Sequence, residues 1–190
     1  MKSKYFIFCK NFADFIGMRY VIKIIFVILV LACSCTPPQT HVRTPPPASA
    51  QENTIVREVL RSHNVSQPRK TIVRTAHSLR GVPYLSGGVT PKGFDCSGFV
   101  LYVYDKAGIT VPRRSDQQYA NGRKVSLKNT KAGDLVFFQT TSRRISHVGI
   151  YVGDGMFIHS PSTGKHVSYA SMNNSFWRSR YRGSVTYLRR

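Results

Sequence analysis

Residues 146–159 constrain the fold more than any other part of the sequence, because they predict a β-hairpin. Residues 146–152 show a period-two pattern, which is typical of a strand in a sheet. Gly153-Asp154-Gly155 is a turn sequence, and residues 156–159 form the expected returning strand. An antiparallel sheet is therefore expected in this part of the chain.

The same hairpin predicts which side chains meet. If the three turn residues form the loop, Val152 lies opposite Met156 and Gly149 lies opposite His159. His147 shares a face with Gly149, so His147 and His159 are predicted to be diagonal neighbours on that face. A slip of one residue would separate them. Two histidines on one face can supply a base and the partner that orients it.

A cysteine at the start of a predicted helix is the second constraint. Asp95 is the expected N-cap, which puts Cys96 in the first turn, where unpaired amides and the helix dipole favour an anion. The pKa of the thiol, ordinarily about 8.5, is expected to be lowered there. Gly98 is expected to leave space above the sulfur for a substrate. The helix pattern ends at Gly108 and consists of Phe99, Val100, Val103, Tyr104 and Ala107.

The residues alone leave other interpretations open for these side chains. A lone cysteine is often a small buried hydrophobe, and lone histidines in strands are often only packed or exposed. Zinc binding by Cys96, His147 and His159 is a further alternative, although no other cysteine or carboxylate stands at a convincing ligand spacing. A single cysteine with histidines downstream favours a nucleophile instead.

Two further elements are predicted around this centre. Residues 71–79 show a helical pattern, with His77 on its polar side as a surface histidine. Residues 133–138 predict a turn that leads into a buried strand.

The first 33 residues are interpreted as a lipoprotein-type signal peptide. The apolar run of residues 21–32 is interrupted only by Lys23 and is too short to predict a transmembrane helix. Residues 30–33 resemble a lipobox, in which Cys33 would be acylated, and Cys35 is the rival position. Met18 is the possible true start, because it gives a cleaner leader.

Residues 34–67 are interpreted as a tether with a short helix. Residues 36–51 are rich in Pro, Thr, Ser and Ala and predict an extended segment. The amphipathic stretch that follows, residues 55–60, is either a helix lying on the domain or an ordered end of the tether. The domain itself is assigned to residues 68–190.

The charge of the chain is strongly positive. The formal net charge is +20, which predicts attraction to a polyanion such as a nucleic acid, an anionic membrane or a carboxylate-rich wall polymer. No zinc-finger or RNA-binding motif accompanies this charge, and an exported protein rarely meets nucleic acid. A nucleic-acid partner is therefore not expected.

Several motifs, in order and correctly spaced, resemble the NlpC family of papain-like bacterial cell-wall cysteine peptidases. The resemblance implies an α+β, papain-like fold, in which the helix bearing the nucleophile packs on a small antiparallel sheet. It implies hydrolysis of stem peptides at the bond between D-γ-glutamyl and diaminopimelate or lysine. The motifs are Gly81–Tyr84, Gly87-Gly88, Gly93–Gly98, Pro112-Arg113, Gln118, Gly133–Phe138, Ser146–Tyr151 and His159.

This resemblance, together with general triad chemistry, implies a role for each site residue. Cys96 is the expected nucleophile, His147 the base that takes its proton, and His159 the residue that orients His147. The Cys96 amide and the Tyr84 hydroxyl would stabilise the oxyanion, unless Tyr84 is only a packed loop aromatic. The side chains expected to contact substrate are Asp95, Ser97 and Arg113, although helix capping explains Asp95 nearly as well and Arg113 and Arg114 could be solvated surface.

No cofactor and no metal is expected, and the protein is expected to be a monomer. Its expected partners are stem peptides and, through the lipid, a membrane. The expected location is the periplasm, at the outer membrane, because Ser34 follows Cys33. Two alternatives remain: an amidase or acyltransferase of the same superfamily, and a non-catalytic wall-binding lipoprotein.

Overall fold

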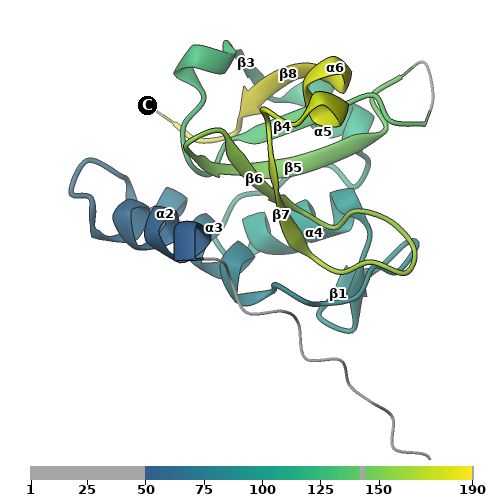
Figure 1. Ribbon diagram of the computed structural model, residues 1–190, viewed down its shortest axis with the longest axis horizontal. Helices are drawn as coiled ribbons and strands as arrows, with labels where there is room; N and C mark the ends of the chain where they lie inside the picture. The colour runs from purple at the N-terminus through teal and green to yellow at the C-terminus, as the bar shows by residue number, and fades with distance from the viewer. Residues whose placement is uncertain (1–49, 142–143, 190) are drawn as a thin grey trace, which may run out of the picture. The chain divides into compact units, whose positions relative to one another are not determined.

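The computed structural model describes residues 50–141 and 144–189, and at its centre is a six-stranded antiparallel sheet (Figure 1). The strand order is β3-β8-β4-β5-β6-β7, and a separate two-stranded sheet pairs β1 with β2. The strands are β1 (Val89–Thr90), β2 (Gly93–Phe94), β3 (Arg123–Val125), β4 (Leu135–Phe138), β5 (His147–Gly153), β6 (Met156–His159), β7 (Ser168–Ser171) and β8 (Tyr181–Thr186).

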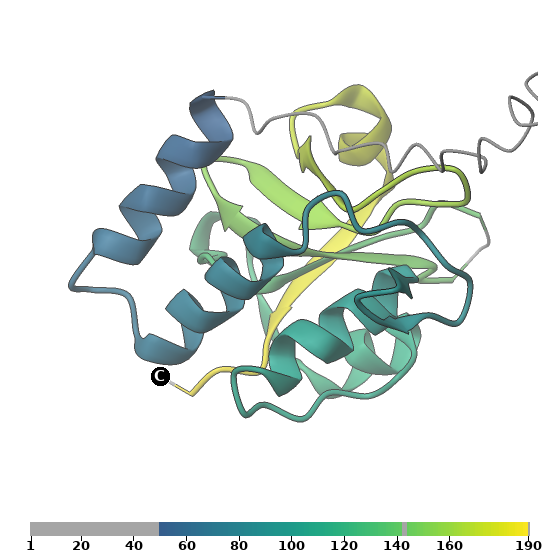
Figure 2. The same cartoon turned by 90° about the horizontal axis from the view of Figure 1, so that it is seen from below.

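Helices cover both faces of the large sheet, but unequally. Three of them, α2, α3 and α4, lie on one face, whereas the short α6 lies on the other (Figure 2). The helical segments are α2 (Ala50–Arg61), α3 (Gln67–Ser78), α4 (Cys96–Asp105), α5 (Ser115–Asn121), the 3₁₀ turn η2 (Leu127–Asn129) and α6 (Ser175–Arg180).

The expected α+β architecture is confirmed, with α4 packed on β5. Asp95 caps α4 as predicted, since its carboxylate accepts a hydrogen bond from the Gly98 amide at 2.7 Å. The chain leaves the helix through Gly108, whose φ of +72° favours glycine. The Asp95 cap makes Cys96 the first residue of α4, which ends at Asp105.

The predicted start of the preceding helix is wrong by four residues. α3 begins at Gln67 rather than at Thr71, because a proline is well tolerated in the first helical turn. Its inward face is the predicted one, with Ile72, Val73 and Ala76 buried.

The amphipathic stretch before α3 is a helix that lies on the domain. Ile55 and Val56 on α2 are buried, and Ile55 belongs to the main hydrophobic core. The predicted signal peptide, the acylated Cys33 and residues 36–49 of the Pro-rich tether lie outside the described residues. The prediction of an extended chain is wrong for residues 50 and 51, which form the start of α2. Within the described residues, none of the helices has the length and apolarity needed to cross a membrane.

The strands β5 and β6 pair in the predicted register away from the turn, but the turn itself differs from the predicted one. Ile150 pairs with Ile158, as the predicted register requires, yet Gly153 rather than Val152 lies opposite Met156. A β-bulge between Tyr151 and Gly153 accounts for the difference. The turn is therefore a tight two-residue turn, and the bulge restores the alignment of the two strands beyond it.

The two faces of the sheet carry separate hydrophobic clusters. The face under the helices holds the main core, in which Val148 and Ile150 of β5 pack against residues of α4 such as Phe99 and Val100. The other face holds a smaller, mainly aromatic cluster, flanked by Trp177 of α6. The buried members of this second cluster are Val136, Phe138, Phe157 and Met172.

Candidate active site

Cys96 lies where the start of α4 meets the start of β5. Its side chain is half-buried, and its sulfur lies 4.0 Å from the carbonyl oxygen of Ser146, to which the thiol donates. Ser146 directly precedes His147, the first residue of β5. The fold thus brings the cysteine to the backbone that carries the first histidine.

The surroundings of the Cys96 thiol contradict the expected lowering of its pKa. Burial raises the pKa, and the negative charge of Asp95 raises it further. The backbone amides of Val148, Ser97 and Cys96 act in the opposite direction but do not reverse the shift. The sequence showed the helix start but not the burial of the sulfur, which disfavours the charged form. Cys96 is therefore a neutral thiol at rest at neutral pH.

Asp95 and Arg113 form a bidentate ion pair beside the thiol. Arg113 donates to Asp95 Oδ1 at 3.0 Å and also to Oδ2, and it donates to the Ser97 hydroxyl at 2.8 Å. Burial alone would raise the pKa of Asp95, but hydrogen bonds from Arg113, Gly98 and Ser97 hold it below its ordinary value. The three residues expected to contact substrate thus form one cluster, whereas the exposed Arg114 pairs with Asp116.

His147 and His159 form a buried, hydrogen-bonded pair, as the hairpin register predicted. Nε2 of His147 lies 2.7 Å from Nδ1 of His159, and the two side chains are only 4% and 3% exposed. Because Nε2 of His147 is engaged, Nδ1 is the ring nitrogen that remains for proton exchange. The first residue of β5 and the last residue of β6 meet in this contact.

Burial keeps both imidazoles neutral. It lowers the pKa of His147 from 6.5 to about 4. The pKa of His159 is lowered well below its ordinary value by burial, and then by the nearby His147 and Lys165. A neutral imidazole can accept a proton, which is the state that a general base requires.

Trp177 is a residue of this site that the sequence reasoning missed. Its ring stacks on His147 at 5.3 Å between centroids and meets His159 edge-on at 4.9 Å. It comes from α6, more than fifteen positions after His159, on a helix of six residues that no periodic pattern reveals. The only available signal was that it is the sole tryptophan of the chain.

Tyr84 lies in the segment between α3 and β1, beside the start of α4. Its amide donates to the carbonyl of Lys165 at 2.9 Å, which ties this segment to the loop after β6. Burial raises the pKa of the Tyr84 hydroxyl, and the nearby Cys96 and Asp95 raise it further. The hydroxyl is therefore protonated at neutral pH and can donate a hydrogen bond.

Gly98 serves close backbone packing rather than the predicted space for substrate. A Cβ atom at this position would lie 2.0 Å from the carbonyl oxygen of Gly88. The Gly88 carbonyl also accepts the Asp95 amide at 3.1 Å. The expectation for Gly98 was wrong because the loop before β1 occupies the space that the missing side chain leaves.

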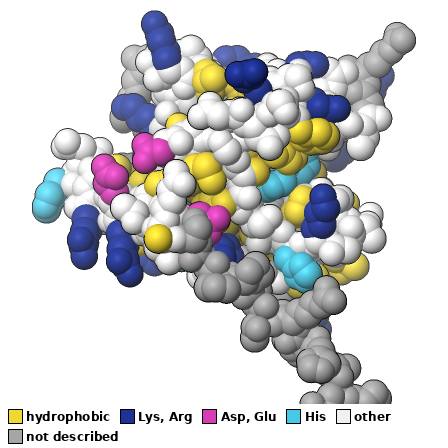
Figure 3. Space-filling view, viewed as in Figure 1, with side chains coloured by type: hydrophobic (Ala, Val, Ile, Leu, Met, Phe, Trp, Pro, Cys, Tyr) yellow, Lys and Arg dark blue, Asp and Glu magenta, His cyan; other side chains and the backbone are white. Residues whose placement is uncertain are grey.

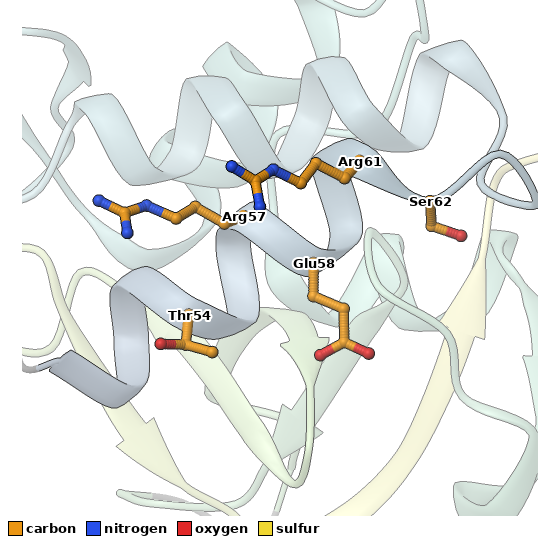
Figure 4. A pocket seen from close by; sticks show the side chains of 5 residues that line it. All are labelled: Thr54, Arg57, Glu58, Arg61 and Ser62. Atoms are coloured by element: carbon orange, nitrogen blue, oxygen red, sulfur yellow. The ribbon is translucent and has the colours of Figure 1, made fainter.

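Two hollows lie away from these residues. One is a depression on α2 of about 510 Å³, lined by Thr54, Arg57, Glu58, Arg61 and Ser62 (Figure 4). The other, of about 940 Å³, runs past the start of α3 and the ends of β3, β5 and β8. Neither is lined by Cys96 or by the histidine pair. Among the described residues, no three His, Cys, Asp or Glu side chains are grouped so that they could hold a metal ion.

Comparison with known proteins gives consistent matches over the same part of the chain. The profile described as the NlpC/P60 family matches residues 81–186. The gamma-DL-glutamyl hydrolase of Bacillus subtilis is 45% identical over 115 residues, which cover 59% of this chain and 28% of the relative. The bifunctional muramidase/DL-endopeptidase CwlT of the same organism is 43% identical over 112 residues, covering 57% and 33% of the two chains.

A solved structure agrees with these matches. The crystal structure of an NlpC/P60 family protein from Bacillus cereus superposes with a TM-score of 0.61 at 36% identity, over 64% of this chain and 40% of that one. The chain thus spans about a third of the length of these curated relatives.

Proposed function

The chain belongs to the NlpC/P60 family, and from this premise we propose that residues 68–190 form a peptidoglycan endopeptidase domain that cleaves stem peptides. The proposed scissile bond is the one between D-γ-glutamyl and diaminopimelate, in keeping with the DL specificity in the names of two relatives. The observation that carries the proposal is a half-buried cysteine at a helix start, whose sulfur lies 4.0 Å from the carbonyl oxygen of the residue before His147, one member of a buried histidine pair.

In the proposed reaction, the proton moves between neutral groups. Nδ1 of His147 accepts the proton of the Cys96 thiol while the sulfur attacks the peptide carbonyl carbon. The tetrahedral intermediate then expels the amine, which takes the proton from His147, and a thioester remains on Cys96. Water hydrolyses this thioester and restores the thiol. The contact between His147 and His159 supports a role for His159 in fixing the ring and its tautomer.

The oxyanion of this intermediate needs hydrogen-bond donors. We assign this role to the Cys96 amide and to the hydroxyl of Tyr84, whose raised pKa keeps its proton in place. One such donor is typically worth about 3 kcal/mol in the transition state.

The cluster of Asp95, Ser97 and Arg113 is the proposed contact for charged groups of the substrate. It combines a carboxylate, a hydroxyl and a guanidinium next to the nucleophile. A stem peptide offers both amine and carboxylate groups, so either end of this ion pair can be matched by an opposite charge.

Digestion of purified muropeptides tests the activity. A tetrapeptide stem is incubated with the protein and with the Cys96→Ala variant as the blank, and the products are identified by mass. Cleavage at the proposed bond leaves L-alanyl-D-glutamate on the sugar and releases the diaminopimelate-containing peptide. Loss of the whole stem from the sugar indicates an amidase, and transfer of an acyl group to an added amine indicates an acyltransferase. Intact muropeptides would favour the non-catalytic alternative.

A location at a carboxylate-rich wall agrees with the surface charge. Lys and Arg side chains are spread over the face seen in Figure 3, whereas acidic side chains are few there. We place the protein in the periplasm, held at the outer membrane by lipid on Cys33. One acyl chain binds a membrane weakly, but the several chains of a mature lipoprotein anchor stably.

Mass spectrometry of the mature N-terminus tests this anchor. The Cys33→Ala variant is expected to lose its lipid and to remain an unprocessed or differently cleaved precursor. Cys35→Ala is the matched control and is expected to be acylated like the wild type. Lipid on Cys35, or an unlipidated wild-type protein, would refute the assignment.

A further inference from the structure

The histidine pair is enclosed by aromatic rings on the side away from α4. The rings of Phe138 and Phe157 lie 6.3 Å from His147 and 5.0 Å from His159, respectively. Trp177 contacts both histidines and both phenylalanines, with the Phe rings at 4.8 and 5.2 Å. It is therefore the one side chain described here whose ring contacts span the whole pair.

The helix α6 that carries Trp177 is held at both ends. Asn174 caps its start by accepting the Phe176 amide at 2.9 Å, and the carbonyl of Arg180 accepts the Gln139 amide at 2.9 Å. No residue of α6 is fully buried, and most are exposed, so Trp177 makes the main inward contact. The helix thus presents a single large ring to the histidines.

From this geometry we propose that Trp177 is a positioning residue for the reaction, which holds the His147 ring against His159 and excludes water from the pair. The inference rests on the proposed function, since it assigns His147 the role of proton acceptor. A stacked indole restricts the tilt of the imidazole, and the edge contact does the same for His159. Small misplacement of a reacting group costs orders of magnitude in rate, so this restriction has a kinetic consequence.

Few charged groups face the enclosed pair. Besides burial, His147 and Lys165 lower the pKa of His159, whereas burial alone lowers the pKa of His147. Removal of the indole would expose the buried His147 ring to solvent. The pKa of His147 is then expected to rise from about 4 toward its ordinary 6.5.

The test replaces the ring in steps. In Trp177→Leu, kcat on muropeptides is expected to fall at least about tenfold with KM changed less than about twofold. The acid limb of the kcat/KM profile is expected to move to higher pH. Trp177→Phe keeps an aromatic ring and is expected to lie between Trp177→Leu and the wild type. Leu127→Ala is the control, because Leu127 is 50% exposed on η2 and its replacement is expected to leave every value unchanged.

NMR titration of the His147 imidazole gives a readout that needs no substrate. The signal is expected to titrate at higher pH in Trp177→Leu than in the wild type. An unchanged titration together with unchanged kcat, or a rise in KM alone, would overturn the inference. If Trp177→Leu does not fold, the Trp177→Phe variant is titrated instead. A His147 signal that titrates there at the same pH as in the wild type would also overturn the inference. If the wild type releases no product from muropeptides, the proposed function fails, while the titration still judges the role of Trp177.

Discussion

The two halves of the site differ in charge and in burial. The half at the start of α4 is charged, with Asp95, Ser97 and Arg113 bound to one another beside the thiol. The half on the sheet is buried and uncharged, because His147 and His159 lie among aromatic rings. This difference explains why, in the resting site, the proton stays on the Cys96 thiol and not on the His147 imidazole. Burial and then the charge of Asp95 oppose a thiolate at Cys96, and burial opposes an imidazolium at His147, so both groups are neutral at rest.

The largest effect is expected from the nucleophile. Cys96→Ser keeps the size of the side chain and the helix cap, but a hydroxyl is a much weaker nucleophile beside a neutral imidazole. Hydrolysis of stem peptides is expected to be abolished, while the thermal unfolding midpoint stays close to that of the wild type. Residual activity above about a tenth of the wild-type rate would be incompatible with Cys96 as the nucleophile.

Replacements of the two histidines distinguish the proton acceptor, His147, from the residue that orients it, His159. His147→Ala is expected to cost nearly as much activity as the loss of Cys96, since the thiol loses its base and the leaving amine its acid. His159→Asn and His159→Gln are expected to retain measurable turnover, because an amide can still hydrogen-bond the imidazole. His159→Ala is expected to fall between these variants and His147→Ala.

Steady-state kcat on a defined stem peptide measures this order. Each variant is first checked for folding, because burying a smaller side chain leaves a cavity. Should His159→Gln be as inactive as His147→Ala, the unequal division of roles between the histidines is wrong.

A smaller effect is expected from the hydroxyl of Tyr84. Tyr84→Phe removes one proposed oxyanion donor and keeps the ring, so kcat is expected to fall about a hundredfold with little change in KM. Tyr187→Phe is a suitable control, since that hydroxyl donates to the Gln118 carbonyl instead. A Tyr84→Phe variant as active as the wild type would leave Tyr84 as a packed loop aromatic.

The last prediction concerns stability in acid rather than the rate of the reaction. The pKa of His147 is lower in the folded protein than in the unfolded chain, so the unfolded chain binds more protons between pH 6.5 and about 4. The stabilisation is complete above about pH 6.5 and is lost as the pH falls toward 4. His147 alone is expected to contribute roughly 3 kcal/mol to this loss.

Urea unfolding at a series of pH values measures that loss. The His147→Gln variant lacks the titrating group, and its free energy of unfolding is expected to depend less steeply on pH over the same window. Parallel curves for the two proteins would show that His147 is not buried as a neutral group.

The elements that sequence predicted best are those with local signals. Asp95 caps the start of α4, and Gly108 follows its end. The period-two pattern with its turn was enough to predict the contact between His147 and His159. The predictions that failed, and the site residue that was missed, depend on packing between segments that are distant in the sequence. Trp177 reaches the histidines from a helix between β7 and β8, and the burial that raises the pKa of Cys96 comes from the whole fold. Gly98 was misjudged because its neighbour, Gly88, lies in a loop whose path the sequence does not give.

The bulge beside the β5–β6 turn links the number of residues in this hairpin to the face of the sheet on which His159 lies. Surface turns usually tolerate insertions and deletions. Here, an inserted residue that neither the turn nor the bulge absorbs would shift the phase of β6 and turn His159 to the opposite face of the sheet. A deletion that removes only the bulged residue would instead leave the pairing of Ile150 with Ile158 intact. Asp154 in this turn has a φ of +47°, so glycine, asparagine and aspartate are the residues that suit the position in variants and grafts of this domain.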